Sequence, residues 1–118
     1  MSLNQYFVVF FKKGPNWTEA SSPELDERQK KHLIHLQDLY GAGKLAITGP
    51  VDDHSDTSMR AMAVFYRHAF ATVDELKELV EEDELFETGH LTAEYATWYF
   101  PEGQMLNARH SVQWTPVV

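Results

Sequence analysis

Apolar residues occur along this chain in two kinds of segment, and the short apolar runs bounded by turn residues predict strands. The first of these segments, Tyr6–Phe11, is rich in β-branched and aromatic residues and is ended by Gly14, Pro15 and Asn16. The same pattern predicts three further strands, at Leu45–Thr48, Met59–His68 and Leu91–Phe100. Together these segments predict a small sheet.

Two other segments have apolar residues at helical spacing. The longer begins with Ser22 as its N-cap and runs to about Ala42. The second opens with a capping box at Thr72–Glu75 and runs through about Glu82. The residues Asp83–Thr88 then predict one further helical turn.

The predicted order of elements is β-α-β-β-α-β, which is the split βαβ arrangement of ferredoxin-like folds. It predicts an α+β protein with a four-stranded antiparallel sheet. The chain shows neither an internal repeat nor a low-complexity linker, so we expect one domain over residues 1–118. The core of that domain is expected at about residues 5–100, with a C-terminal extension at residues 101–118.

The predicted sheet is apolar on both faces. In the first strand Tyr6, Val8 and Phe10 point to one side, and Phe7, Val9 and Phe11 to the other. Two helices cover only one face, so the other would be a large exposed apolar patch. A second copy of the chain would cover it, and we therefore expect a homodimer of the α/β-barrel type. The alternative is that the C-terminal extension covers this face.

Composition narrows the classes of function. The 118 residues include no cysteine, which excludes disulfides and thiolate zinc sites. The formal net charge is −8, from 18 acidic and 10 basic residues, which disfavours binding to nucleic acid or to an anionic membrane. No apolar stretch approaches the roughly 20 residues that span a bilayer. The apolar run that ends before Lys12 is too short for a signal peptide, so we expect a cytoplasmic protein.

Two segments resemble signatures of the YciI-like (YCII-related) family. The first is Arg28–Leu36, followed by Gly43–Leu45 and Thr48–Pro50, and the second is Glu82–Gly89. The resemblance covers most of residues 5–100, and it implies the dimeric, ferredoxin-like α+β barrel superfamily.

Matched residue by residue, the resemblance places the proposed active-site pair of that family on His32 and Asp83. It also places Gly49 and Pro50 near the pocket, where they would contact a substrate. Glu84 stands where the family usually has proline, and the residues after Phe100 extend beyond the usual end of the family.

A histidine–aspartate pair suits proton transfer near neutral pH. Imidazole has an ordinary pKa of about 6.5, and a carboxylate on one ring nitrogen leaves the other nitrogen free to act on a substrate. We expect Asp83 at the C-terminal end of its helix, where the helix dipole disfavours a negative charge, so a partner such as His32 would explain it. The alternative is a buried polar contact that joins two helices.

Other charged and metal-binding side chains leave alternatives open. Arg28, one helical turn before His32, is a candidate for binding an anionic substrate or for pairing with a surface acid. His32 and His35 have a spacing that suits one metal ion, and the loop at residues 52–56 offers further ligands, but we predict neither a metal nor a cofactor.

The remaining histidines and the tryptophans are interpreted structurally. His54, His68, His90 and His110 are isolated in sequence and are expected to be solvated or locally bonded. The three tryptophans are expected in the core or at a dimer interface, and the alternative is a stacking role for a ring-shaped substrate: Trp17, Trp98 and Trp114.

Two functions follow from these observations. The resemblance implies a cofactor-independent lyase, isomerase or dehalogenase in which His32, oriented by Asp83, moves a proton on a small organic acid or lactone. The second hypothesis is a non-catalytic, dimeric module that binds a small ligand in the same pocket. Neither the substrate nor the leaving group can be read from the residues.

Overall fold

A computed structural model describes residues 3–102 of the chain. Its strands are β1 (Leu3–Lys13), β2 (Leu45–Pro50), β3 (Met59–Tyr66) and β4 (Leu91–Pro101). Its helices are α1 (Pro23–Gly41), the 3₁₀ helix η1 (Arg67–Ala69), α2 (Val73–Val80) and α3 (Glu84–Glu87). None of the helices in this part of the chain is long and apolar enough to cross a membrane.

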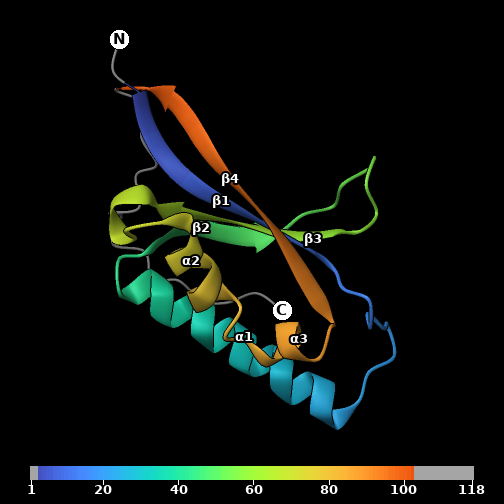
Figure 1. Ribbon diagram of the computed structural model, residues 1–118. Helices are drawn as coiled ribbons and strands as arrows, with labels where there is room; N and C mark the ends of the chain where they lie inside the picture. Colours follow the sequence, from blue (N-terminus) through green and yellow to red (C-terminus); the bar gives the residue numbers. More distant parts are fainter. Residues whose placement is uncertain (1–2, 103–118) are drawn as a thin grey trace.

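The four strands form one antiparallel sheet in the order β2-β3-β1-β4. Figure 1 shows α1, α2 and α3 together on one face of this sheet. The arrangement confirms the predicted α+β, ferredoxin-like fold. β1 and β3 are paired on both sides and form the centre of the sheet.

Local sequence signals set the helix ends. The hydroxyl of Ser22 accepts a hydrogen bond from the Leu25 amide at 3.1 Å, and that of Thr72 accepts one from the Glu75 amide at 3.2 Å. Gly43, with φ of 76°, follows the end of α1. The third strand ends at Tyr66 rather than at His68, because residues 67–69 turn into η1.

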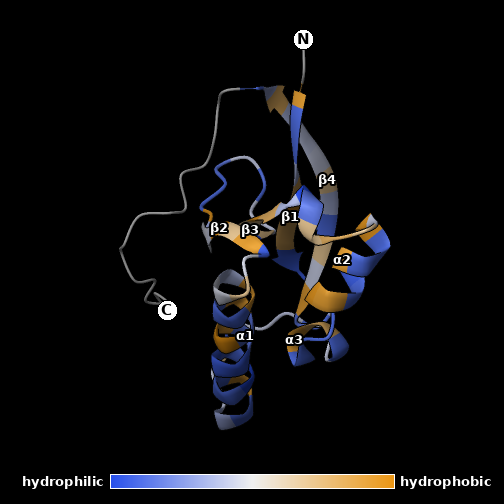
Figure 2. Ribbon diagram, turned by 90° about the vertical axis from the view of Figure 1, so that its left-hand side faces the viewer, coloured by the Kyte–Doolittle hydropathy of each residue, from blue (hydrophilic) through white to orange (hydrophobic). Residues whose placement is uncertain are grey.

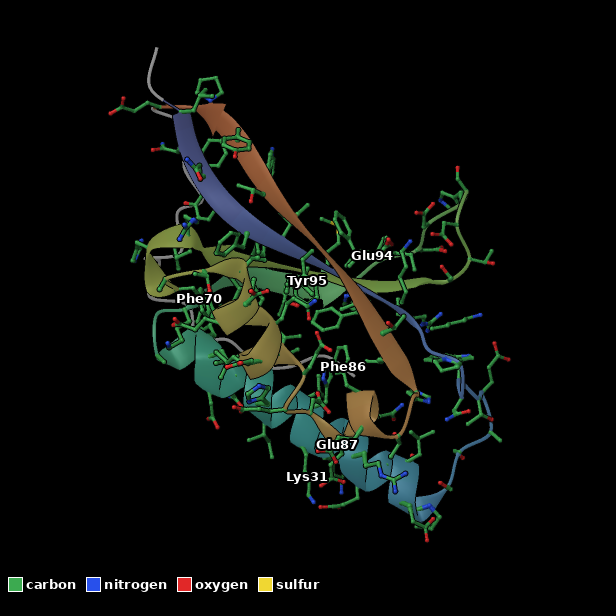
Figure 3. The ribbon with its side chains drawn as sticks, viewed as in Figure 1. Lys31, Phe70, Phe86, Glu87, Glu94 and Tyr95 are labelled. Carbon is green, nitrogen blue, oxygen red and sulfur yellow. The ribbon has the colours of Figure 1, made fainter. Side chains whose placement is uncertain are left out.

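The core lies between the sheet and the helices. Phe7, Val9 and Phe11 of β1 face the helices, and all three are buried. Their neighbours on β3 include Phe65, opposite Phe7, which is fully buried. Figure 3 shows Phe70 and Phe86 pointing into the same space between sheet and helices. Burying one such aromatic side chain contributes about 1.5–3 kcal/mol to stability.

The face of the sheet away from the helices carries a cluster of aromatic residues. The Tyr6 ring stacks on Phe100 with centroids 5.1 Å apart, and Trp98 packs edge-on against Phe100 at 5.7 Å. The Trp98 side chain is 48% exposed. The sheet is therefore apolar on both faces, as predicted.

Figure 2 shows how hydrophilic α1 is by comparison, with orange apolar positions interspersed among blue ones.

Candidate functional site

A cavity of about 460 Å³ opens beside α1 and the edge of the sheet. This volume lies within the range of small-molecule sites. Much of its lining is apolar, formed by Phe11, Leu33, Leu36, Pro50, Ala61, Leu85 and Leu91. The remaining lining residues are Trp17, Gln29, His32, Thr48, Gly49, Arg60 and His90.

His32 and Asp83 meet at this cavity from different elements. His32 lies on α1, and Asp83 immediately precedes α3. Nδ1 of His32 donates a hydrogen bond to Oδ2 of Asp83, whose side chain is only 3% exposed. The His32 ring packs edge-on against Phe11, with centroids 5.7 Å apart. Within residues 3–102 no hydrogen-bond partner contacts Nε2 of His32, which is the nitrogen on the other side of the ring.

The environment of Asp83 corrects one expectation. Asp83 is not the end of the second helix, because α2 already ends at Val80. It is the N-cap of α3, and its Oδ1 accepts a hydrogen bond from the Leu85 amide at 2.9 Å. A carboxylate is favoured at a helix N-terminus, so the helix dipole does not oppose it. The two oxygens of Asp83 thus have separate tasks, one as a cap and one as the partner of His32.

A second group of cavity residues comes from segments far apart in the sequence. The Trp17 indole stacks on the imidazole of His90, with centroids 4.3 Å apart and planes 27° from parallel. The Arg60 guanidinium lies over the Trp17 ring, 4.8 Å from its centroid. We call Trp17, Arg60 and His90 the stacked cluster. Nε1 of Trp17 is buried and has no hydrogen-bond partner among the described residues.

His90 differs from His32 in its electrostatic surroundings. Burial, reinforced by the positive charge of Arg60, lowers the pKa of His90 below its ordinary value. The imidazole of His90 is therefore neutral at neutral pH. The cavity thus contains one histidine bonded to a carboxylate and one that burial keeps uncharged.

A close backbone contact brings the stacked cluster together. The Gly14 amide donates to the carbonyl of His90 at 2.9 Å, and the Asn16 amide donates to the carbonyl of Gly89 at 2.8 Å. A Cβ atom at residue 14 would lie 2.2 Å from the Gly89 carbonyl oxygen, so only glycine fits there. This contact holds the loop that carries Trp17 against the start of β4.

The stacked cluster is a group of residues that sequence reasoning missed. From the sequence, Trp17 is expected in the core or at an interface, His90 is interpreted as an isolated histidine, and Arg60 carries no prediction. The one local signal is the breaker segment at residues 14–16 directly before Trp17. Trp98, by contrast, lies on the open sheet face, and Trp114 lies outside the described residues.

The other predicted site residues lie as follows. Gly49 and Pro50 line the cavity, and their contact with a substrate stays a prediction. Arg28 does not line it. The Nε atom of Arg28 lies 3.7 Å from the carboxylate of Glu84, which also receives a hydrogen bond from Lys31 at 3.1 Å. Of the two interpretations of Arg28, the surface ion pair is thus the one that the geometry supports.

The residues considered for metal binding do not converge. Nε2 of His35 donates to the Leu79 carbonyl at 2.9 Å, away from the His32–Asp83 pair. In the loop at residues 52–56, Asp56 pairs with Lys12 at 3.0 Å, and bonds from Ser58 and Lys12 lower the pKa of Asp56 to about 2. Residues 3–102 contain no group of three or more metal-ligating side chains.

Comparison with known proteins supports the fold. No protein-family model matches the chain, and no curated protein matches it in sequence. Among solved structures, this chain is similar to that of 5-chloro-2-hydroxyhydroquinone dehydrochlorinase from Burkholderia phenoliruptrix AC1100. That enzyme was solved in complex with 2,5-dihydroxybenzoquinone. The two share 19% sequence identity with a TM-score of 0.52, over 83% of this chain and 95% of that chain.

A second solved structure overlaps less well. It is SnoaB, a cofactor-independent oxygenase from Streptomyces nogalater, with 11% identity and a TM-score of 0.43, over 88% of this chain and 98% of that chain. At 19% identity, the likeness to the first structure shows the fold alone, which is the α+β, ferredoxin-like fold.

Proposed function

We propose that this protein is a cofactor-independent enzyme that transfers a proton on a small organic acid or lactone. In this proposal His32 is the catalytic base and Asp83 is the residue that orients it. The observation that carries the proposal is the geometry of His32, whose Nδ1 donates to a buried carboxylate while the ring lines a cavity of about 460 Å³. The motif resemblance to YciI-like proteins supports the same pair.

The bond to Asp83 determines what His32 can do. Because a carboxylate accepts the Nδ1 proton, the neutral ring carries its lone pair on Nε2. Nε2 can then take a proton from a substrate carbon next to a carbonyl group, and the electron pair of the C–H bond forms an enolate. Once His32 is an imidazolium, the adjacent Asp83 carboxylate stabilises its positive charge.

The fate of the enolate distinguishes the possible reactions. Return of the proton from Nε2 to another carbon of a conjugated system is an isomerisation. If chloride leaves with its electron pair, the product gains a double bond and the reaction is a dehydrohalogenation. Both need a positioned base and an apolar site, which the cavity lining provides.

The open face of the sheet supports a homodimer as part of this proposal. It carries the cluster of Tyr6, Trp98 and Phe100, together with Ile47, which is 54% exposed. A second copy would bury this apolar surface.

Trp98→Glu is expected to convert the dimer into a monomer in light scattering. A wild-type protein that is monomeric at all concentrations would contradict the dimer.

The alternative function is a non-catalytic dimeric module that binds a small ligand. The observation that favours it is the second task of Asp83, because a residue that caps α3 has a structural reason to be there. In that case the pair would fix the position of α1 against α3, and the cavity would bind a ligand without changing it.

Deuterium exchange tests the proposal for any reaction that begins with the loss of a carbon-bound proton. A set of small organic acids, lactones and chlorinated hydroquinones, with 2,5-dihydroxybenzoquinone as a further candidate ligand, would be incubated with the protein in D₂O. Proton NMR then reports loss of carbon-bound hydrogen, and released chloride is measured in parallel. We expect exchange or chloride release that His32→Ala lowers by about 10²–10⁴-fold.

The exposed residue His54 provides the matched control, since His54→Ala removes an imidazole outside the cavity. Thermal unfolding checks that the His32→Ala protein is folded. If exchange is equally fast in the wild type and in folded His32→Ala, His32 is not the base. If no compound exchanges but some bind, the protein is the binding module.

A further inference from the structure

We propose that Arg60 and Trp17 form an anion-binding subsite in the cavity, which holds the carboxylate or enolate oxygen of a small ligand with an apolar body. Arg60 supplies the positive charge, and Nε1 of Trp17 supplies a hydrogen-bond donor. This inference rests on the proposed function and deepens it by assigning the substrate class and the residues that recognise it. Binding of the anion itself does not depend on catalysis by His32.

The strongest observation is the unpaired donor of Trp17. Nε1 is buried, and no acceptor contacts it among residues 3–102. Leaving a buried donor without an acceptor is unfavourable, so such groups are usually paired. Trp17 lines the cavity, so a ligand oxygen that reaches its Nε1 would supply the missing acceptor.

Arg60 has no carboxylate partner among the described residues, in contrast to Lys12, Arg28 and Lys31. Lys13 also lies over the Trp17 ring without such a partner, 5.6 Å from its centroid, but it does not line the cavity. Lys12 pairs with Asp56 and Glu94, and both Arg28 and Lys31 pair with Glu84. Within the described residues no carboxylate pairs with Arg60, although the whole chain has 18 acidic residues and a net charge of −8. Its contact is the face of the Trp17 ring at 4.8 Å, which leaves the edge of the guanidinium free to bind a carboxylate through two hydrogen bonds.

The rest of the cavity lining favours the same class of ligand. None of the described residues that line it is an aspartate or glutamate, so no lining side chain repels an anion. His90, which stacks on Trp17, also lines the cavity. Leucines at positions 33, 36, 85 and 91 offer apolar surface to the body of the ligand.

The subsite would stabilise the negative charge that forms when the His32–Asp83 pair removes a proton. Proton abstraction from carbon places negative charge on an oxygen of the substrate. The guanidinium of Arg60 stabilises that oxygen electrostatically, and the indole N–H of Trp17 adds a donor once the ligand oxygen reaches it. Arg60 and Trp17 would then bind the oxygen while Nε2 of His32 takes the proton.

Calorimetric titration with benzoate and benzamide tests the subsite, because these probes share a shape and differ in charge. We expect benzoate to bind more tightly than benzamide. Arg60→Gln is expected to weaken benzoate about tenfold or more with little change for benzamide, because it removes a charged partner. Trp17→Phe keeps a stacking ring but removes Nε1, and is expected to weaken benzoate about threefold to tenfold.

Lys30→Gln is the matched control, since Lys30 is an exposed residue of α1 that does not line the cavity. It removes the same charge as Arg60→Gln and is expected to change benzoate affinity less than twofold. Equal binding of the two probes overturns the subsite, as does an effect of Arg60→Gln no larger than that of Lys30→Gln. Failure of benzoate to bind at millimolar concentration also counts against it.

The subsite and the proposed function can fail separately. If Arg60→Gln weakens benzoate selectively but no compound exchanges deuterium, the subsite stands and the enzyme proposal fails. If deuterium exchange depends on His32 while Arg60→Gln and Trp17→Phe change neither KM nor benzoate affinity, the enzyme proposal stands and the subsite fails.

Discussion

His32 and Asp83 are held at the cavity by directional hydrogen bonds, whereas Trp17, Arg60 and His90 are held there by stacking of flat groups. Both oxygens of Asp83 have donors, one from His32 and one from the Leu85 amide. In the stacked cluster the contacts are between ring faces and a guanidinium, and Nε1 of Trp17 has no partner among the described residues.

In the proposed function, this difference corresponds to two tasks at one cavity. A base must keep one tautomer and one orientation, and hydrogen bonds fix both. A ligand-binding surface must keep its donors free, and stacking positions a side chain without using them. The two histidines also differ in their surroundings, because His32 is bonded to a carboxylate while burial disfavours a protonated His90.

The largest expected effect comes from removing the charge of Asp83 while keeping its shape. In Asp83→Asn the amide nitrogen faces Nδ1 of His32, so the ring would carry its proton on Nε2 instead. We expect turnover to fall by about 10²–10⁴-fold. Nitrogen-15 NMR of the His32 ring would report the tautomer. An unchanged tautomer with unchanged turnover would remove Asp83 from the mechanism.

The stacked cluster is tested by Gly14→Ala. The added Cβ would meet the Gly89 carbonyl oxygen at 2.2 Å and push the Trp17 loop away from His90. We expect a loss of about 1–3 kcal/mol in the free energy of unfolding, measured with urea. A Cβ atom added at Gly41 would meet nothing within 4 Å, so Gly41→Ala should not destabilise the fold. Similar stability of the two variants would show that the close approach is unimportant.

A smaller effect separates the two tasks of Asp83. Asparagine can still cap α3 through its side-chain oxygen, but alanine cannot. We therefore expect Asp83→Ala to be about 1 kcal/mol less stable than Asp83→Asn, while both variants lose turnover. Chemical denaturation of the two proteins side by side gives this difference. Equal stabilities would mean that the hydrogen bond to the Leu85 amide contributes nothing measurable.

The smallest expected effect is the pH dependence contributed by His90. Its pKa is lowered in the folded protein, so below about pH 6.5 the unfolded chain binds the proton more readily. This contribution to stability is therefore present above pH 6.5 and is lost as the pH falls. His90→Phe keeps a flat ring against Trp17 and should flatten the acid side of a stability curve, whereas His54→Gln should not. If the stability of His90→Phe falls at low pH as steeply as that of the wild type, His90 does not contribute to this pH dependence.

The helix starts, the strands and the order of elements agree with the prediction, and they depend on local sequence signals. The N-caps of α1 and α2 at Ser22 and Thr72 depend on hydrogen bonds between residues three apart. The strands follow from short runs of apolar, β-branched and aromatic residues, and the order of elements follows from the strands and helices together. The His32–Asp83 pair is predicted through the motif resemblance, and its hydrogen bond spans 51 positions that no local pattern connects.

The errors have a physical cause as well. The sequence places Asp83 at the end of a helix, because a stretch of helix formers does not reveal that α2 stops at Val80 and that a four-residue helix starts anew at Glu84. The sequence singles out Arg28 as the candidate cation, because it lies one helical turn before His32, and makes no prediction for Arg60. The ion pair of Arg28 with Glu84 and the position of Arg60 over Trp17 arise from the packing of separate elements.

The sequence by itself determined the strands, the helix starts, the two apolar faces of the sheet and, through its motifs, the dyad. These features depend on side-chain period and on contacts between near neighbours, which act before the chain folds. Only the tertiary structure decided that Trp17, Arg60 and His90 share a cavity with His32. The backbone bonds from residues 14 and 16 to residues 90 and 89 bring them together, because these bonds exist only when β1 and β4 are already paired.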